Sequence, residues 1–222
     1  MNEASKTRTL WGPRERAWLE GKGLDIGCGP DPILPGVRAF DVGDGDANEI
    51  TAYVSDSFDF VFSSHCLEHM HDPRHALEQW WHLVKPGGHL IVIVPDEDLY
   101  EQGYFPSVFN LDHKATFTVS KNRSWSPRSY NLLDLVTELP GGAIVSIEVQ
   151  DAGLDRSLLA HAPVPPGVAR MFGRLRGAFH ARVRRAVARR ALDRSLRLLG
   201  IPLDQTLSAA VAQIQAVVRK AT

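Results

Sequence analysis

The sequence predicts an α/β fold, built around a mostly parallel sheet with helices on both faces. Two apolar, β-rich segments, 58–63 and 89–94, are separated by a segment of helical periodicity at 72–84. Residues 85–88, Lys-Pro-Gly-Gly, stop that helix before the second strand begins. Strand, helix and strand with turn signals between them is the pattern of a parallel sheet. At 222 residues without an internal repeat, the chain is expected to form one domain, 1–222.

The first crossover of the sheet is expected to be abbreviated. Only residues 30–38 separate the first two strands, and the three prolines among them oppose a regular helix. A parallel crossover normally takes a dozen or more residues, so a loop or a single turn is expected here. The other elements follow from shorter patterns: strands at 24–26, 39–42, 143–149 and 210–219, and helices at 11–20 and 127–139.

A basic helical segment at 163–200 is predicted as an insertion before the last strand. Between Val168 and Gly200 there are ten arginines, no lysine and one acid, Asp193, although the whole chain has a net charge of −1. Three interpretations remain open: a solvated helix face over an apolar stripe of Phe179, Val183, Val187 and Ala191, a surface for an anionic partner such as nucleic acid, or a membrane-surface helix. Nucleic acid is not favoured, because no aromatic residues are interleaved for base stacking.

Composition indicates in which cellular compartment the protein is expected. No run approaches the 18 apolar residues of a membrane span, and the N-terminus lacks the apolar core of a signal peptide. Cys28 and Cys66 are the only cysteines, and nothing suggests that they form a disulfide. A protein of the reducing cytoplasm is therefore expected.

Three ordered motifs carry a family resemblance. Residues 24–29 read Leu-Asp-Ile-Gly-Cys-Gly at the end of a strand, 45–47 read Gly-Asp-Ala, and 85–90 lead into a later strand. Together they resemble the class I S-adenosylmethionine-dependent methyltransferases of the small bacterial type. The resemblance implies a Rossmann-like sheet, S-adenosylmethionine as cofactor and methyl transfer as the activity. A nicotinamide fold would need another glycine at 32, where this chain has proline.

The same resemblance implies the cofactor-binding residues. The backbone at Gly27, Cys28 and Gly29 would face the amino-acid end of the cofactor, since glycines allow close approach. Asp25 would accept from the cofactor ammonium or order the loop. Asp41, at the end of the second strand, would accept hydrogen bonds from the ribose hydroxyls, unless it is an ordinary loop acid.

A second group of residues is expected on the adenine and substrate sides. Asp46 would accept from the adenine amine and Ala47 would leave room for the ring, the alternative for Asp46 being a helix cap. Ser64 and His65 follow the 58–63 strand, and ligands of open parallel sheets bind outside the carboxyl ends of the strands. They are therefore expected at the junction of cofactor and acceptor.

His113 is the candidate general base, held by Asp112, with His65 and Asp96 as competitors. The cofactor carries the difficult chemistry of methyl transfer, so the protein mainly positions the acceptor and removes a proton from a hydroxyl. No metal is expected. The pairs His65/His69 and His71/His75 have metal-ligand spacing, but no carboxylate or cysteine set in the sequence completes them.

The predicted function is S-adenosylmethionine-dependent methylation of a small molecule or a sugar or glycan, at oxygen or nitrogen. Two alternatives remain: a cofactor-binding interaction module without catalysis, and an RNA-modifying methyltransferase that uses the basic helix.

Overall fold

The computed structural model describes residues 3–119, 121–160, 164–183 and 185–222. Its centre is a six-stranded sheet in the order β2-β1-β3-β4-β8-β7. The strands β1 (Gly23–Ile26), β2 (Arg38–Phe40), β3 (Phe58–Ser64) and β4 (Val84–Pro95) pair in parallel. β8 (Gln213–Lys220) lies antiparallel between β4 and β7 (Gly142–Gln150). The predicted mostly parallel α/β sheet is confirmed.

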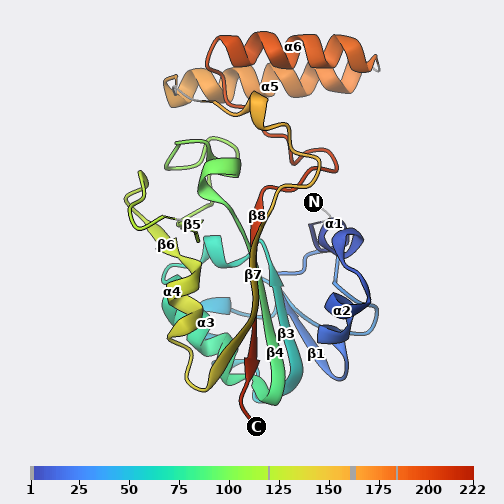
Figure 1. Cartoon of the computed structure of the whole chain (residues 1–222), viewed down its shortest axis with the longest axis vertical. Helices are drawn as coiled ribbons and strands as arrows, with labels where there is room; N and C mark the ends of the chain where they lie inside the picture. Colours follow the sequence, from blue (N-terminus) through green and yellow to red (C-terminus); the bar gives the residue numbers. More distant parts are fainter. Residues whose placement is uncertain (1–2, 120, 161–163, 184) are drawn as a thin grey trace.

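Helices cover both faces of this sheet (Figure 1). One face packs against α3 (Pro73–His82) and α4 (Leu132–Thr137), and the other against the N-terminal segment with α1 (Glu3–Leu10), α2 (Pro13–Arg16) and the 3-10 turn η1 (Ala17–Leu19). The central strands are buried on both sides, because alternate residues of β4 enter the two cores: Leu90 and Val92 one, Ile91 and Ile93 the other. This explains why these strands read as continuous apolar runs.

The start signal of α3 and the absence of a helix in the first crossover are confirmed. The Asp72 side chain accepts from the backbone of Arg74 and His75, and Pro73 occupies the first helical position of α3. Residues 27–37, all of which the structure describes, contain no helix, so the first crossover is abbreviated as predicted. Ile33 of this loop packs into the core beside the N-terminal segment instead.

Several element boundaries differ from the prediction. β4 already begins at Val84, so residues 85–88 lie inside this strand, and β2 ends at Phe40 rather than at 42. The helix expected at 11–20 begins only at Pro13 and continues from Ala17 as a 3-10 turn, and the polar helix α1 before it was not predicted. The helix expected at 127–139 begins only at Leu132, since β6 (Ser129–Asn131) pairs in parallel with β5 (Thr116–Thr118) and Asn131 caps α4. The last strand begins at Gln213 rather than at 210.

The basic segment between β7 and β8 forms a hairpin of α5 (Pro166–Arg182) and α6 (Ala186–Leu198), after the short turn η5 (Arg156–Leu158). It lies beyond the carboxyl ends of the parallel strands, away from the sheet (Figure 1). The inserted basic segment is thus confirmed, with its first predicted residue, 163, outside the described part of the chain. The boundaries of one domain over 1–222 remain a prediction.

The expected apolar stripe of Phe179, Val183, Val187 and Ala191 along one helix is not found, because the segment folds back on itself as two helices. Val187 is 80% exposed, whereas residues from both helices pack together around Leu196: Val168, Phe172 and Leu192. The Arg176 guanidinium spans the two helices to the Asp193 carboxylate at 2.7 Å. None of the helices in the described part of the chain is long and apolar enough to cross a bilayer.

Candidate active site

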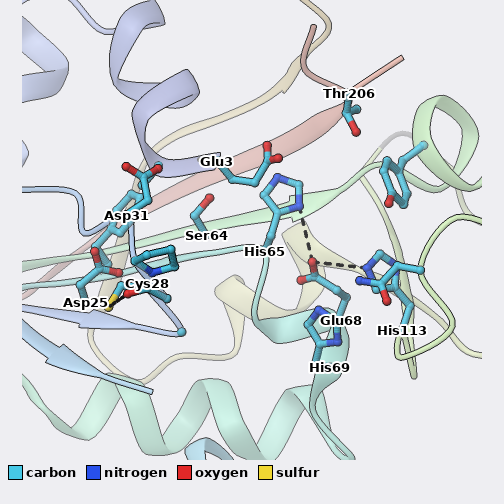
Figure 2. A pocket seen from close by; sticks show the side chains of 17 residues that line it. Glu3, Asp25, Cys28, Asp31, Ser64, His65, Glu68, His69, His113 and Thr206 are labelled. Atoms are coloured by element: carbon cyan, nitrogen blue, oxygen red, sulfur yellow. Dashed lines mark hydrogen bonds and ion pairs between the residues drawn. The ribbon is translucent and has the colours of Figure 1, made fainter. Parts of the chain in front are cut away.

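Two adjoining hollows lie at the carboxyl ends of β1, β2 and β3. The larger cleft has a volume of about 660 Å³ and is bordered by the β1 and β2 loops and the 3-10 segment η2 (Ala47–Ala52). The smaller cavity has a volume of about 210 Å³ and reaches toward α1 and the loop around 110 (Figure 2). Among the residues that the structure describes, four border both hollows: Gly27, Gly29, His65 and His69.

The glycine loop after β1 has the backbone conformation that only glycine adopts without strain. Gly27 has φ of +74° and Gly29 has φ of +52°. A Cβ at Gly27 would lie 2.6 Å from the Cys66 side chain, whereas a Cβ at Gly29 would meet nothing closer than Asp41 Oδ2 at 3.9 Å. Gly27 therefore serves close packing, and Gly29 leaves its backbone beside open space.

Asp25 orders the loop that follows it. Its Oδ2 accepts from the Ile33 backbone amide at 2.7 Å, which matches the loop-ordering alternative for this residue. Burial raises the pKa of Asp25 to about 7, and Asp31 and Asp41 add to the rise. Burial also raises the pKa of the Cys28 thiol to about 11, so this side chain is neutral at physiological pH.

Asp41 borders the larger cleft and binds its surrounding backbone. Its Oδ2 accepts from Gly29 N at 2.6 Å and its Oδ1 from Val42 N at 2.7 Å. Each carboxylate oxygen has two lone pairs, so both retain capacity for a further donor in the cleft. The contact with Gly29 also joins the ends of β1 and β2 across the glycine loop.

Asp46 and Ala47 form another wall of the cleft. Asp46 is the N-cap of η2, as the helix-cap alternative supposed, and accepts from the backbone of Asn48 at 2.9 Å. The hydrogen bonds from Asn48 lower the pKa of Asp46, so it is an anion at neutral pH. The Ala47 carbonyl accepts from the buried Trp80 indole at 2.9 Å, which fixes this wall against α3.

Ser64 borders the smaller cavity rather than the larger cleft. It is the last residue of β3, and its buried hydroxyl has no hydrogen-bond partner among the described residues. A buried hydroxyl normally finds a partner. Its position therefore favours contact with a molecule in the smaller cavity.

Glu68 lies at the centre of a group of histidines (Figure 2). The residue is 1% exposed, and neither carboxylate oxygen accepts a hydrogen bond from the described residues. His65 Nδ1 lies 3.5 Å and His113 Nε2 3.8 Å from Glu68 Oε1, longer than ordinary hydrogen bonds. Burial raises the pKa of Glu68, but the surrounding histidines outweigh it and lower the pKa below its ordinary value.

His113 is buried beside this group, but the partner predicted for it is wrong. Its Nδ1 lies 2.6 Å from Glu101 Oε1, whereas Asp112 is bound to His69 Nδ1 at 2.8 Å. The two neighbours point to different sides of the loop, because His113 is 5% exposed and the Asp112 side chain is 70% exposed. The Asp112-His113 pair in the sequence was therefore not a pair in space.

His65 has an unusual backbone and a defined tautomer. Its φ of 55° is left-handed, which turns the chain sharply after β3. The Gln213 amide donates to Thr7 and Gln150. The Gln213 Oε1 atom lies 3.1 Å from His65 Nε2 and therefore accepts a hydrogen bond from it. Burial lowers the pKa of His65, but the Glu68 carboxylate at its other nitrogen outweighs burial, so the pKa is raised.

Asp96 does not border either hollow, although it was a competing candidate base. It caps the turn η4 (Glu97–Glu101) and accepts from the backbone of Asp98 and Leu99 at 3.0 Å. Burial raises its pKa.

Comparison with known protein families agrees with this architecture. The family model described as a methyltransferase domain matches residues 6–200. The chain is an S-adenosylmethionine-dependent methyltransferase of this family. A comparison with curated protein sequences finds no match.

Solved structures of other methyltransferases share the fold of this one. A SAM-dependent methyltransferase from Archaeoglobus fulgidus has 16% identity and a TM-score of 0.50, over 99% of this chain and 95% of that chain. Phosphoethanolamine N-methyltransferase 2 of Haemonchus contortus has 14% identity and a TM-score of 0.50, over 98% of this chain and 52% of that chain. The cyclase SpnF has 17% identity and a TM-score of 0.50, over 99% and 81%. A fold shared with a cyclase means that the acceptor chemistry must be argued from the site itself.

The larger cleft of the methyltransferase fits its cofactor. Its volume of about 660 Å³ lies within the range of about 300–1,000 Å³ that small-molecule sites occupy. Gly29 offers open backbone there, and the side-chain oxygens of Asp41 and Asp46 offer acceptors for hydroxyl and amine groups. When bound, S-adenosylmethionine supplies an electrophilic methyl group on a sulfonium sulfur.

Sequence reasoning missed three residues of the methyltransferase site: Glu68, Glu101 and Gln213. Glu68 lies between two histidines of the 65–69 stretch, so its position there was an available signal. Glu101 and Gln213 reach the site from η4 and β8, and no local pattern connects them to His113 or His65.

Proposed function

We propose that this methyltransferase methylates an oxygen or nitrogen of a small molecule or a glycan. The observation that supports the proposal is the border between the two hollows, where Gly27, Gly29, His65 and His69 belong to both. A cofactor in the larger cleft and an acceptor in the smaller cavity would meet at this border. Holding two reactants in contact is the main contribution that a protein makes to such a transfer.

Of the proposed cofactor residues, Asp41, Asp46 and Ala47 border the larger cleft, whereas Asp25 and Cys28 border the smaller cavity. The amino-acid end of the cofactor would therefore reach that cavity across the shared border at Gly27 and Gly29. Asp41 would accept from ribose hydroxyls, Asp46 from the adenine amine, and Ala47 would contact the ring. Asp25, Gly27, Cys28 and Gly29 would surround the amino-acid end. Ser64 borders the same smaller cavity, which supports the expected role at the junction between cofactor and acceptor.

The proposed acceptor side contains His65 and His113, both beside Glu68. Glu101 holds the ring of His113, and Gln213 holds the ring of His65. Both imidazoles therefore have fixed orientations. A fixed imidazole facing a small cavity suits the positioning of an acceptor hydroxyl or amine. The cavity of about 210 Å³ suits a small acceptor or the reacting end of a larger glycan.

An RNA acceptor is less well supported. Arg176 and Arg189 of the hairpin bind groups of the hairpin region itself: Asp193, the Asp204 carbonyl, and the carbonyls of His180 and Val183. Fewer guanidinium groups therefore remain for phosphates than the sequence suggested. The family assignment also favours catalysis over a binding module without turnover.

The test is transfer of a labelled methyl group to sets of small alcohols, amines and sugars, and to RNA. Ala4→Leu would narrow the smaller cavity from α1, and Ala52→Leu is the control on the exposed end of η2. We expect transfer to a small acceptor that Ala4→Leu lowers at least about tenfold with unchanged cofactor affinity, a loss of about 1.4 kcal/mol. Transfer to RNA alone, or insensitivity to Ala4→Leu, would contradict the proposal.

A further inference from the structure

We propose that Glu68, His69 and His113 form a binding site for one divalent transition-metal ion in the wall of the smaller cavity. The role of the ion, holding an acceptor oxygen or nitrogen, rests on the proposed function; the binding of the ion does not.

The three donor atoms converge on one point. One ligand atom from each residue lies within 4.8 Å of the others, and His113 Nε2 lies 3.8 Å from Glu68 Oε1. Two ligands each about 2.1 Å from an ion lie about 3.4 Å apart in a tetrahedral site. The widest pair of donor atoms therefore has to close by at most about 1.4 Å, which side-chain rotations provide.

Both histidines are oriented as metal ligands usually are. A metal-binding histidine typically donates its second ring N–H to a carboxylate, which fixes the tautomer and leaves the other nitrogen bare. His69 Nδ1 lies 2.8 Å from Asp112 Oδ2, and His113 Nδ1 lies 2.6 Å from Glu101 Oε1. In each ring the carboxylate bond leaves Nε2 free to ligate. This arrangement occurs twice on one cluster.

Glu68 is the independent observation that points to a ligand. A carboxylate that is 1% exposed with neither oxygen hydrogen-bonded among the described residues is costly unless a further group compensates it. The purely structural alternative is an ion pair with His65, but at 3.5 Å that contact leaves the second oxygen without a partner. An ion between Glu68 and the two histidines would compensate the charge directly.

The donor set selects the kind of ion. Two imidazoles and one carboxylate are ligands for zinc, iron or cobalt, whereas magnesium and calcium prefer sites made of oxygens. Three protein ligands leave at least one coordination position open. Because Glu68, His69 and His113 all border the smaller cavity, an open position would face it. An acceptor hydroxyl bound there would be held in place and made more acidic.

The experiment titrates the full chain, freed of metal by a chelator, with Co²⁺ and Zn²⁺. Cobalt binding is followed by visible absorption and zinc binding by calorimetry. We expect one equivalent of either ion and the visible bands of a four- or five-coordinate cobalt site. Glu68→Gln should weaken binding at least tenfold, and Asp112→Ala should weaken it about 10- to 100-fold by releasing His69.

His75→Ala is the matched control. His75 is an exposed histidine on α3 that also contacts a carboxylate, Glu49 at 2.9 Å, outside the cluster. The His75→Ala variant should bind metal with the same affinity as the unmodified chain. Asp112→Ala keeps the test valid if Glu68→Gln does not fold, since the Asp112 side chain is 70% exposed.

Two results would overturn the site: no stoichiometric binding of either ion, or binding that Glu68→Gln and Asp112→Ala leave unchanged. S-adenosylmethionine affinity, measured in parallel, separates the two proposals. Cofactor binding without metal binding contradicts the metal site alone, whereas metal binding without cofactor binding contradicts the proposed function alone.

Discussion

The two hollows of this methyltransferase share an edge of the sheet but are built differently. The residues proposed for the cofactor come largely from one stretch, 25–47, and act through backbone and short acids. The proposed acceptor cavity combines His65, Glu68 and His69 with His113. The rings of His113 and His65 are held by Glu101 and Gln213, which are distant in the chain. A site built from one stretch is legible in the sequence, whereas a site built from several stretches exists only after folding.

The largest expected effect is a loss of turnover on changing a residue that borders the smaller cavity alone. His113→Ala removes a buried side chain of the proposed acceptor cavity, and this side chain does not border the larger cleft. Turnover with an identified acceptor should fall by about 10²–10⁴, the usual contribution of a positioned catalytic group. Initial rates with labelled cofactor measure this. Near-normal turnover would move the acceptor role to His65.

The end of β1, beside the smaller cavity, should show its own pH dependence through Asp25. In the folded chain burial raises its pKa to about 7, and the unfolded value is near 3.8. Between these values the folded state holds the extra proton, so stability is greatest at low pH and falls as pH rises toward 7. The slope reaches about 1.4 kcal/mol per pH unit at most.

Asp25→Asn keeps an acceptor for Ile33 N without the titrating proton, so it is the reference chain. The free energy of unfolding of the two chains, measured by urea denaturation from pH 5 to 8, should diverge in favour of Asp25→Asn as pH rises. Parallel curves would mean that Asp25 is ionised throughout and that the loop holds it as an anion.

The smallest expected effect concerns the hairpin. Arg174, Arg185 and Arg190 are exposed, and the hairpin lies away from the sheet (Figure 1). Replacing them with Gln should change cofactor affinity by less than about threefold, because distant surface changes are usually worth under about 0.5 kcal/mol. A large loss, measured by calorimetry, would show that the hairpin closes over the cleft and that the two-part description is incomplete.

The sequence predicted the sheet, the helices on both of its faces and the abbreviated first crossover. These features depend on local signals such as the prolines before Arg38 and the cap at Asp72. The sequence analysis missed α1, because this helix is polar and only Ala4 and Thr7 in it are buried. It also paired His113 with Asp112, its neighbour in the chain, since sequence adjacency is the only proximity that a sequence displays. The contacts with Glu101 and Gln213 depend on long-range packing, which no local pattern encodes.

One calorimetric measurement tests the separation of the two hollows most directly. S-adenosylmethionine is titrated into the unmodified chain, Asp41→Asn and His113→Ala, with Asp56→Asn as a control for loss of an exposed surface acid. We expect the unmodified chain to bind the cofactor and Asp41→Asn to bind it about ten- to a hundredfold more weakly, which is about 1.5–3 kcal/mol, with unchanged affinity in the other two. Unchanged affinity in Asp41→Asn together with a large loss in His113→Ala would contradict this separation.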